Sequence, residues 1–127
     1  MRELKFRAWD KRYKQYVKPY VVCLDGRAIV ITEPSNDLET LDSDRVIIEQ
    51  YTGLKDKNGK EIYEGDILCE KWYDSDTHTG RDRIGKVEFF CDSYECWFRG
   101  SVVTLGLFPT KNIEVIGNIH ENAELLG

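Results

Sequence analysis

The sequence predicts a mainly β protein: an SH3-like barrel in the C-terminal half, an N-terminal β-hairpin extension, and at most short helical turns. Two observations support this fold class. About five short apolar runs separated by turn signals lie between residues 46 and 120, which is typical of a small barrel or a strongly bent sheet. Two tight turns also fall close together in the stretch 50–68, where they bring short strands beside one another.

The first of these turns is predicted at Asp56-Lys57-Asn58-Gly59. Asp56 occupies the first position of a type I turn, Asn58 the third, and Gly59 the place where the chain needs a positive φ. A β-branched residue there would cost about 1–2 kcal/mol, whereas glycine costs little.

The second turn is predicted at Glu64-Gly65-Asp66, after a short extended piece at Ile62 and Tyr63. We expect Asp66 to accept hydrogen bonds from backbone N–H groups that are left free as the chain enters residues 67–69.

The chain opens with a strand signature, because residues 4–9 alternate apolar with basic side chains. Trp9 departs from the alternation and falls on the face of Lys5 and Arg7. Residues 10–12 are predicted to turn the chain so that residues 13–20 return as a partner strand. Pro19 places that strand at an edge or marks its end.

A hairpin is predicted next, with strands at residues 21–24 and 28–31 and a two-residue turn at Asp25-Gly26. The polar, acidic residues 33–44 follow and are predicted as a loop, with one helical turn around Leu38 to Leu41. This loop sets the predicted domain boundary: an N-terminal extension over 1–45 and the barrel domain over 46–127.

Further strands are predicted in the second part at 46–48, 67–73, 85–91, 96–98, 102–103 and 113–116. Residues 74–83 are predicted as a long polar loop. Residues 121–126 are expected to close the chain with a helical turn capped by Asn122.

The charge is distributed unevenly along this chain of net charge −5. The first 20 residues hold seven basic and two acidic residues, a balance of +5, so the remaining 107 carry −10. The overall acidity argues against a protein coated in basic charge for nucleic acid.

Charged residues near the start interrupt any apolar segment of a signal peptide, and no run reaches the length of a membrane span. The four cysteines lie in or beside apolar runs, where a thiol acts as a small buried hydrophobe. We therefore expect a cytoplasmic protein with reduced thiols and no membrane contact.

Three stretches together resemble the YopX family, which phages and prophages of Gram-positive bacteria encode. They read R-E-L-K-F-R-A-W-D at 2–10, Q-Y-T-G-L-K-D-K-N-G-K-E-I-Y-E-G-D-I-L at 50–68, and I-E-V-I-G-N-I-H-E-N-A-E-L-L at 113–126. Ala123 stands where the family often has proline. The resemblance implies an SH3-like barrel in the C-terminal half, a phage or prophage origin and a place in the bacterial host cell. It implies no activity and supplies no catalytic residues.

No residue pattern predicts a metal or cofactor site. An EF-hand loop that starts at Asp56 would need an oxygen ligand at Lys60, glycine at Glu61 and glutamate at Ile67. The acidic loop 74–78 with Asp82 offers ligands but is expected to remain solvated.

Catalytic chemistry is not predicted either. Cys91 and Cys96 lack the second Cys or His pair that a zinc site uses. His78 and His120 stand in no Cys–His or Ser–His context. We expect no catalytic residue, no cofactor, no metal and no small-molecule substrate.

The N-terminal segment is the candidate contact region, since aromatic and basic residues interleave there. The candidate residues for contact with nucleic acid or a partner are Arg7, Trp9, Lys11, Arg12, Tyr13 and Lys14. Aromatic rings beside cations can stack bases and neutralise phosphates. A half-buried hairpin whose aromatic residues pack inward explains the same alternation without a ligand and is the favoured interpretation.

The sequence therefore favours a non-enzymatic phage or prophage accessory protein that acts through protein contacts and forms a homo-oligomer. The +5 end and the −10 remainder can attract each other between subunits or within one chain. The alternative is a nucleic-acid-binding module that uses the basic, aromatic N-terminal segment.

Overall fold

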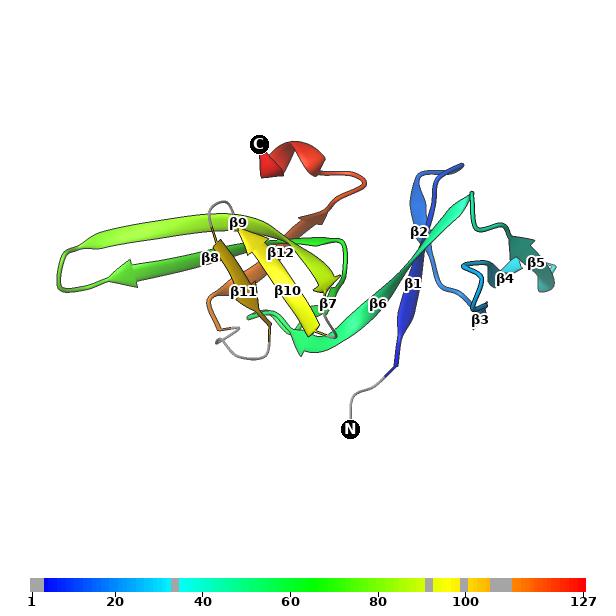
Figure 1. The fold of residues 1–127 in the computed structure, drawn as a ribbon, viewed down its shortest axis with the longest axis horizontal. Coiled ribbons are helices and arrows are strands. Elements are labelled where there is room, and N and C mark those ends of the chain that lie inside the picture. Colours follow the sequence, from blue (N-terminus) through cyan, green and yellow to red (C-terminus); the bar gives the residue numbers. More distant parts are fainter. Residues whose placement is uncertain (1–3, 33–34, 91–92, 99–100, 106–110) are drawn as a thin grey trace. The chain divides into compact units, whose positions relative to one another are not determined.

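The computed structural model describes residues 4–32, 35–90, 93–98, 101–105 and 111–127. The chain forms two compact units, Met1–Tyr51 (unit 1) and Thr52–Gly127 (unit 2). Strands dominate both, and one short 3-10 helix, η1 (Ala123–Leu126), follows the last strand (Figure 1). The predicted mainly β class is confirmed. The described part holds no helix long and apolar enough to span a membrane.

The first sheet has the strand order β2-β1-β6-β7. It comprises β2 (Gln15–Val17), β1 (Phe6–Asp10), β6 (Val46–Lys55) and β7 (Glu61–Tyr63). In unit 1, Ala8 pairs with Val17 on one side and with Ile48 on the other, in antiparallel register. β2 lies at the sheet edge and ends just before Pro19, as expected for a residue that cannot donate to a ladder.

A three-stranded sheet completes unit 1, in the order β3 (Val21–Val22), β4 (Ala28–Thr32) and β5 (Asp37–Leu41). Its inner face contributes to a small apolar core, which consists of Ala8, Ala28, Val30, Leu41 and Val46. The predicted boundary at 45/46 coincides with the start of β6, and unit 1 continues through Tyr51 within that strand.

Unit 2 is built on a five-stranded sheet that curls into a half-barrel (Figure 1). Its strand order is β11 (Ser101–Thr104), β10 (Ser93–Phe98), β9 (Thr79–Phe90), β8 (Asp66–Asp74) and β12 (Ile113–Asn118). Its core consists of Ile62, Leu68, Val87, Tyr94, Cys96, Phe98, Leu105 and Ile113. Each unit thus has its own apolar core, as expected for separate compact units.

The two predicted turns lie where the sequence placed them. Gly59 donates its N–H to the Asp56 carbonyl at 3.0 Å and has φ 81°, and Gly65 has φ 86°. Asp66 accepts a hydrogen bond from the Tyr63 N–H at 2.8 Å, on the preceding strand. Residues 67–69, which follow it, belong to the ladders of β8 with β9 and β12.

Residues 37–41 form β5 and not part of a loop with a helical turn. They pair antiparallel with β4, from Thr32 opposite Asp37 to Ala28 opposite Leu41. The prediction was wrong because it relied on the polarity of these residues, which gives no sign of the pairing with β4. Four of the five residues are exposed, and only Leu41 reaches the core. An exposed edge strand needs few apolar side chains, since its backbone ladder holds it.

The predicted polar loop 74–83 is also incorrect. β8 and β9 continue as a long hairpin, with Asp74 opposite Thr79, and only the four residues 75–78 form the turn (Figure 1). Polar side chains suit this hairpin because an antiparallel ribbon can face water.

The β3–β4 turn and the start of η1 also differ from the expectations. The β3–β4 turn has three residues, Leu24 to Gly26, because Cys23 donates its N–H to the Arg27 carbonyl at 2.9 Å. Asn122 precedes η1 but does not cap it with its side chain; its Oδ1 accepts the Asn118 N–H at 3.1 Å instead.

Candidate interaction surface

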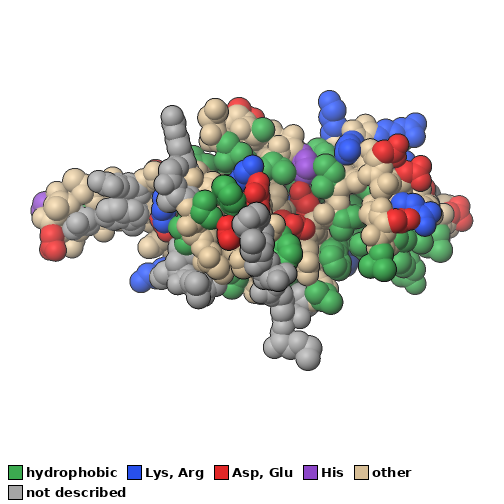
Figure 2. Space-filling model, viewed as in Figure 1, with side chains coloured by type: hydrophobic (Ala, Val, Ile, Leu, Met, Phe, Trp, Pro, Cys, Tyr) green, Lys and Arg blue, Asp and Glu red, His purple; other side chains and the backbone are tan. Residues whose placement is uncertain are grey.

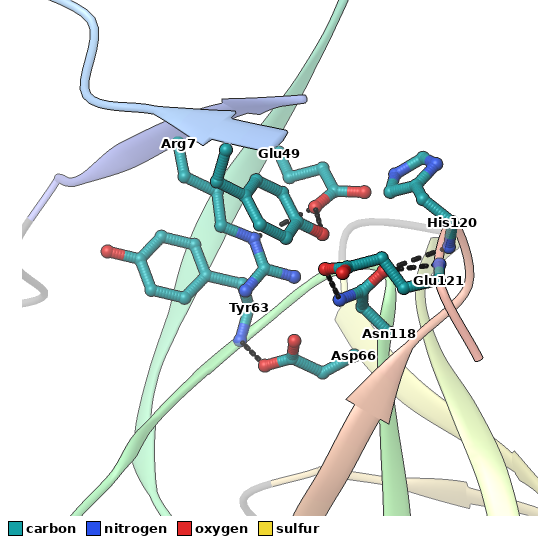
Figure 3. Close-up of polar contacts among 8 residues, drawn as sticks. Arg7, Glu49, Tyr63, Asp66, Asn118, His120 and Glu121 are labelled. Atoms are coloured by element: carbon teal, nitrogen blue, oxygen red, sulfur yellow. Dashed lines mark hydrogen bonds and ion pairs between the residues drawn. The ribbon is translucent and has the colours of Figure 1, made fainter. Parts of the chain in front are cut away.

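Arg7 and Trp9, two of the six candidate contact residues, have structural roles. The Arg7 Nε donates to the Glu49 Oε1 at 2.9 Å, and the Arg7 guanidinium lies 4.1 Å from the centre of the Tyr16 ring. Figure 3 shows Arg7 and Glu49 facing each other. Trp9 is buried and meets Tyr16 edge-on, with ring centres 5.0 Å apart. Neither residue offers a free stacking platform.

Glu49 is the buried centre of this network and was not singled out from the sequence. Its Oε1 accepts from the Tyr16 hydroxyl at 2.8 Å as well as from Arg7. The feature that identifies Glu49 is its position opposite Arg7 on the neighbouring strand. That position is known only once β1 is paired with β6.

Asp10 forms the second buried ion pair of unit 1. Arg45 makes a bidentate ion pair with Asp10: its Nε donates to Oδ1 at 3.1 Å and its Nη2 donates to Oδ2 at 2.9 Å. The hydrogen bonds from Arg45 lower the pKa of Asp10 although burial opposes this, and the backbone N–H groups of Arg12 and Tyr13 lower it further. Asp10 in turn raises the pKa of Arg45. The carboxyl closes the start of the β1–β2 turn, since its Oδ1 also accepts the Arg12 N–H at 2.9 Å.

The other four candidate residues, Lys11 to Lys14, form that turn and are exposed. Lys14 has φ 53°, a conformation that a turn needs. Tyr13 is 61% exposed, and the guanidinium groups of Arg12 and Arg45 lie 5.5 and 5.4 Å from its ring centre. The turn therefore presents one aromatic ring flanked by cations.

The positive charge of the first 20 residues is balanced within unit 1. Residues 1–51 hold nine basic and nine acidic side chains, so unit 1 is neutral and unit 2 carries the whole −5. Part of this balance is direct contact, because Arg45 bridges Asp10 and Glu39, the latter at 3.2 Å.

A groove of about 530 Å³ lies in unit 1, beside the edge strand β2. Val17, Val30 and Leu41 contribute apolar lining, and Tyr13, Lys18 and Arg45 contribute polar and charged lining. Polar and charged side chains, Asp10 and Glu39 among them, make up about half of the lining, so the groove is mixed in character.

The structural residues predicted in unit 2 serve the fold. Asp56 accepts three backbone N–H groups at 2.9 Å each, from Asn58, Lys60 and Val115. Burial would raise the pKa of Asp56, but these three donors outweigh it and lower the pKa. The Val115 bond ties the turn to β12, 59 residues away in the chain.

Further local polar contacts hold the ends of the unit 2 strands. Thr52, not singled out from the sequence, donates its hydroxyl to the Ile62 carbonyl at 2.7 Å. Figure 3 also shows the Tyr63–Asp66 hydrogen bond and the Asn118 side-chain amide donating to Glu121 at 3.0 Å.

The remaining titratable groups gather into no metal-ligand cluster within the described residues. The His78 Nδ1 lies 3.2 Å from the Tyr73 hydroxyl, and the His120 N–H donates to the Asn118 Oδ1 at 3.0 Å. Burial raises the pKa of Cys96 to about 12, which keeps that thiol protonated and unreactive. Cys91, predicted near it, lies outside the described residues.

Fold and surface define a small, mainly β protein of two compact units whose buried carboxylates are held by structural partners. A family model described as YopX protein matches residues 5–127, so the chain belongs to the YopX family, and the resemblance read from the three motifs is confirmed. No curated protein matches the chain.

Two crystal structures are similar over the full length of both chains. One is protein EF1440 from Enterococcus faecalis, with 28% sequence identity and a TM-score of 0.65. The other is protein yopX from Bacillus subtilis, with 21% identity and a TM-score of 0.61. The second likeness concerns the fold alone.

Proposed function

We propose that this protein is a non-enzymatic accessory protein of a phage or prophage, which acts in the bacterial cytoplasm through protein–protein contacts and self-associates. The observation that carries the proposal is the unit 1 groove beside β2, whose lining is partly apolar and partly charged. An edge strand can pair with an extended segment of a partner, and neighbouring apolar pockets then select its side chains.

The buried carboxylates support a role without catalysis. Asp10 is held by Arg45, Glu49 by Arg7 and Tyr16, and Asp56 by backbone N–H groups. A general acid or base needs a carboxyl that can reach a reacting group. These groups instead link strands and turns of the fold.

The proposal is tested by capture from lysogenic host cells and by light scattering of the purified chain. We expect a partner that the wild type retains and that both Val17→Ser and Lys18→Glu lose, because these residues line the groove. Lys60→Glu, an exposed lysine of unit 2, is the matched charge control. Equal capture by all variants, together with a monomer at every concentration, contradicts the proposal.

A second candidate function, nucleic-acid binding, is favoured by the exposed β1–β2 turn. Lys11 and Lys14 form no ion pair with described residues, and Tyr13 is exposed between Arg12 and Arg45. Single aromatic rings beside cations can bind single strands by stacking and phosphate contact. The neutrality of unit 1 as a whole makes this the second choice.

Mobility shifts across salt concentrations decide this alternative. Phosphate contacts predict affinity that falls steeply with salt, and replacing Lys11, Arg12 and Lys14 together with alanine should reduce the salt slope by about 2–3. The absence of binding at low salt to single- and double-stranded DNA and RNA excludes it.

A further inference from the structure

Four basic residues of the β1–β2 hairpin form no ion pair with the residues that the structure describes. They are Lys11, Arg12, Lys14 and Lys18, and all four are exposed. Residues 11–18 contain four basic and no acidic side chains, so this stretch carries a charge of +4. Figure 2 shows Lys and Arg side chains at the top of unit 1, near the β1–β2 turn. An exposed stretch of one sign attracts a partner of the opposite sign.

Val17 and Lys18, adjacent in the chain, both line the unit 1 groove. The two carboxylates of the lining, Asp10 and Glu39, both bind Arg45. Lys18 is therefore the cation of the lining that can meet a carboxylate from outside. Val17 is half-buried and packs against the unit 1 core. At this point of the groove an apolar contact and an available cation lie next to each other.

The same part of the groove lies beside an edge strand. Within the described residues β2 pairs with β1 alone, and Gln15, Val17 and Lys18 bring this edge to the groove. An extended segment that adds to an edge strand gains backbone hydrogen bonds, and its side chains alternate between the two faces of the sheet. A segment in which apolar and acidic residues alternate matches the succession of Val17 and Lys18.

We propose that the groove and β2 bind an extended segment of a partner protein in which acidic and apolar residues alternate. The inference rests on the proposed function by protein–protein contact and names the chemistry of the partner. Nucleic acid is also negatively charged, but it offers no apolar side chain for Val17 and no peptide backbone for β2. The cations are exposed, so added salt weakens the contact.

The experiment is fluorescence anisotropy of labelled synthetic probes titrated with the full chain. The first probe is a peptide of alternating glutamate and valine, the glutamate peptide. The second has lysine in place of every glutamate. The third is the glutamate peptide with N-methylated valines, which cannot donate backbone hydrogen bonds to an edge strand. The fourth is a single-stranded DNA oligonucleotide.

Two groove variants are compared with the wild type: Lys14→Glu combined with Lys18→Glu, and Val17→Ser. The matched control combines Lys55→Glu with Lys60→Glu, two exposed lysines of unit 2, and makes the same change in net charge. Circular dichroism reports whether each variant folds, and two groove variants of different kinds guard against the loss of one.

Support for the inference is a glutamate peptide that binds the wild type at least about tenfold more tightly than the lysine and N-methylated peptides do. Its binding weakens in both groove variants, about tenfold where two lysines are reversed, and not in the control. Equal binding of the glutamate and lysine peptides, or unchanged binding in both folded groove variants, overturns the inference. Equal binding of the N-methylated peptide overturns the pairing with β2.

The remaining outcomes separate this inference from the proposed function. If the DNA binds through Lys14 and Lys18 and the glutamate peptide does not bind, the hairpin is a nucleic-acid site and the inference falls. A partner captured from lysogenic cells through Val17 and Lys18, without binding of the glutamate peptide, overturns the acidic segment and leaves the proposed function standing. Equal capture by all variants, without peptide binding, overturns both.

Discussion

The two units bury acidic side chains in different ways. In unit 1, Asp10 and Glu49 are paired with the cations Arg45 and Arg7, which lie 35 and 42 residues away in the chain. In unit 2, Asp56 accepts three backbone N–H groups, two of them within four residues, and Asp66 accepts the backbone N–H of Tyr63. A buried ion pair depends on one partner side chain, whereas a turn carboxylate depends on the path of the backbone.

This difference explains why the family motif at 50–68 was readable as structure. Its Asp and Gly residues stabilise the turns in which they lie, Asp through hydrogen bonds to nearby backbone N–H groups and Gly through its positive φ. The Val115 N–H adds one distant donor to Asp56. The ion pairs of unit 1 give no such local signal. Four substitutions or conditions test the comparison.

The largest effect is expected at Asp56, where Asp56→Asn should lower the free energy of unfolding by about 3 kcal/mol. The new amide NH₂ replaces an oxygen that accepts a backbone N–H, so one turn or strand donor loses its acceptor. Urea denaturation measures the loss. Asp42→Asn, at an exposed residue, is the control. An equal loss of stability in both variants would contradict the structural role of the Asp56 carboxylate.

Arg45→Met should cost about 2 kcal/mol at neutral pH, because Asp10 remains buried without its cation. Arg45 is itself partly exposed, so the effect is below that of a fully buried pair. Arg27→Met breaks the exposed pair with Asp25 and should cost no more than about 0.5 kcal/mol. If the two variants unfold at the same urea concentration, the Asp10–Arg45 pair is not a structural link.

Acid should weaken both units. The folded-state pKa values of Asp10 and Asp56 are lowered, so their contribution is complete above the unfolded pKa of about 3.9 and is lost as pH falls through the folded values. Thermal unfolding from pH 7 down to pH 2 measures this. The acid-dependent loss should be smaller in Asp56→Asn than in the wild type, and an unchanged loss argues against a lowered pKa at Asp56.

Gly59→Ala should have the smallest effect, about 1 kcal/mol, since its φ of 81° strains an L residue while an added Cβ meets no atom within 4 Å. The neighbouring Lys60→Ala is the control, because the hydrogen bonds of Lys60 in this turn are made by its backbone, which the substitution keeps. Thermal melts distinguish them. A stable Gly59→Ala would mean that the turn does not require the left-handed conformation.

Prediction from the sequence succeeded where residue type sets local conformation. Gly59 and Gly65 lie at positive φ, and Trp9 shares its face with Arg7, as the alternation required. It failed for β5 and for the turn end of the β8–β9 hairpin. These segments are polar, and backbone pairing with a neighbouring strand makes them extended.

For the candidate surface, the sequence predicted a turn at residues 10–12 and a strand from residue 13, whereas the turn covers 11–14 and β2 begins at Gln15. It also could not separate the exposed candidate residues from Arg7 and Trp9. The alternation along a strand predicts on which face of the sheet a side chain lies. Whether that side chain is buried depends on what packs against the face. The groove likewise combines strands that are distant in sequence.

By itself, the sequence determined the fold class, the two turns of the central motif and the membership of the YopX family, because glycine conformation and short-range hydrogen bonds are encoded within a few residues. Tertiary structure alone decided that Arg45 meets Asp10, that Arg7 meets Glu49 and that residues 37–41 join a sheet. Such contacts arise when strands far apart in the chain fall into register. That register depends on which faces pack together and on the turns between strands, and one strand's side chains do not specify it alone.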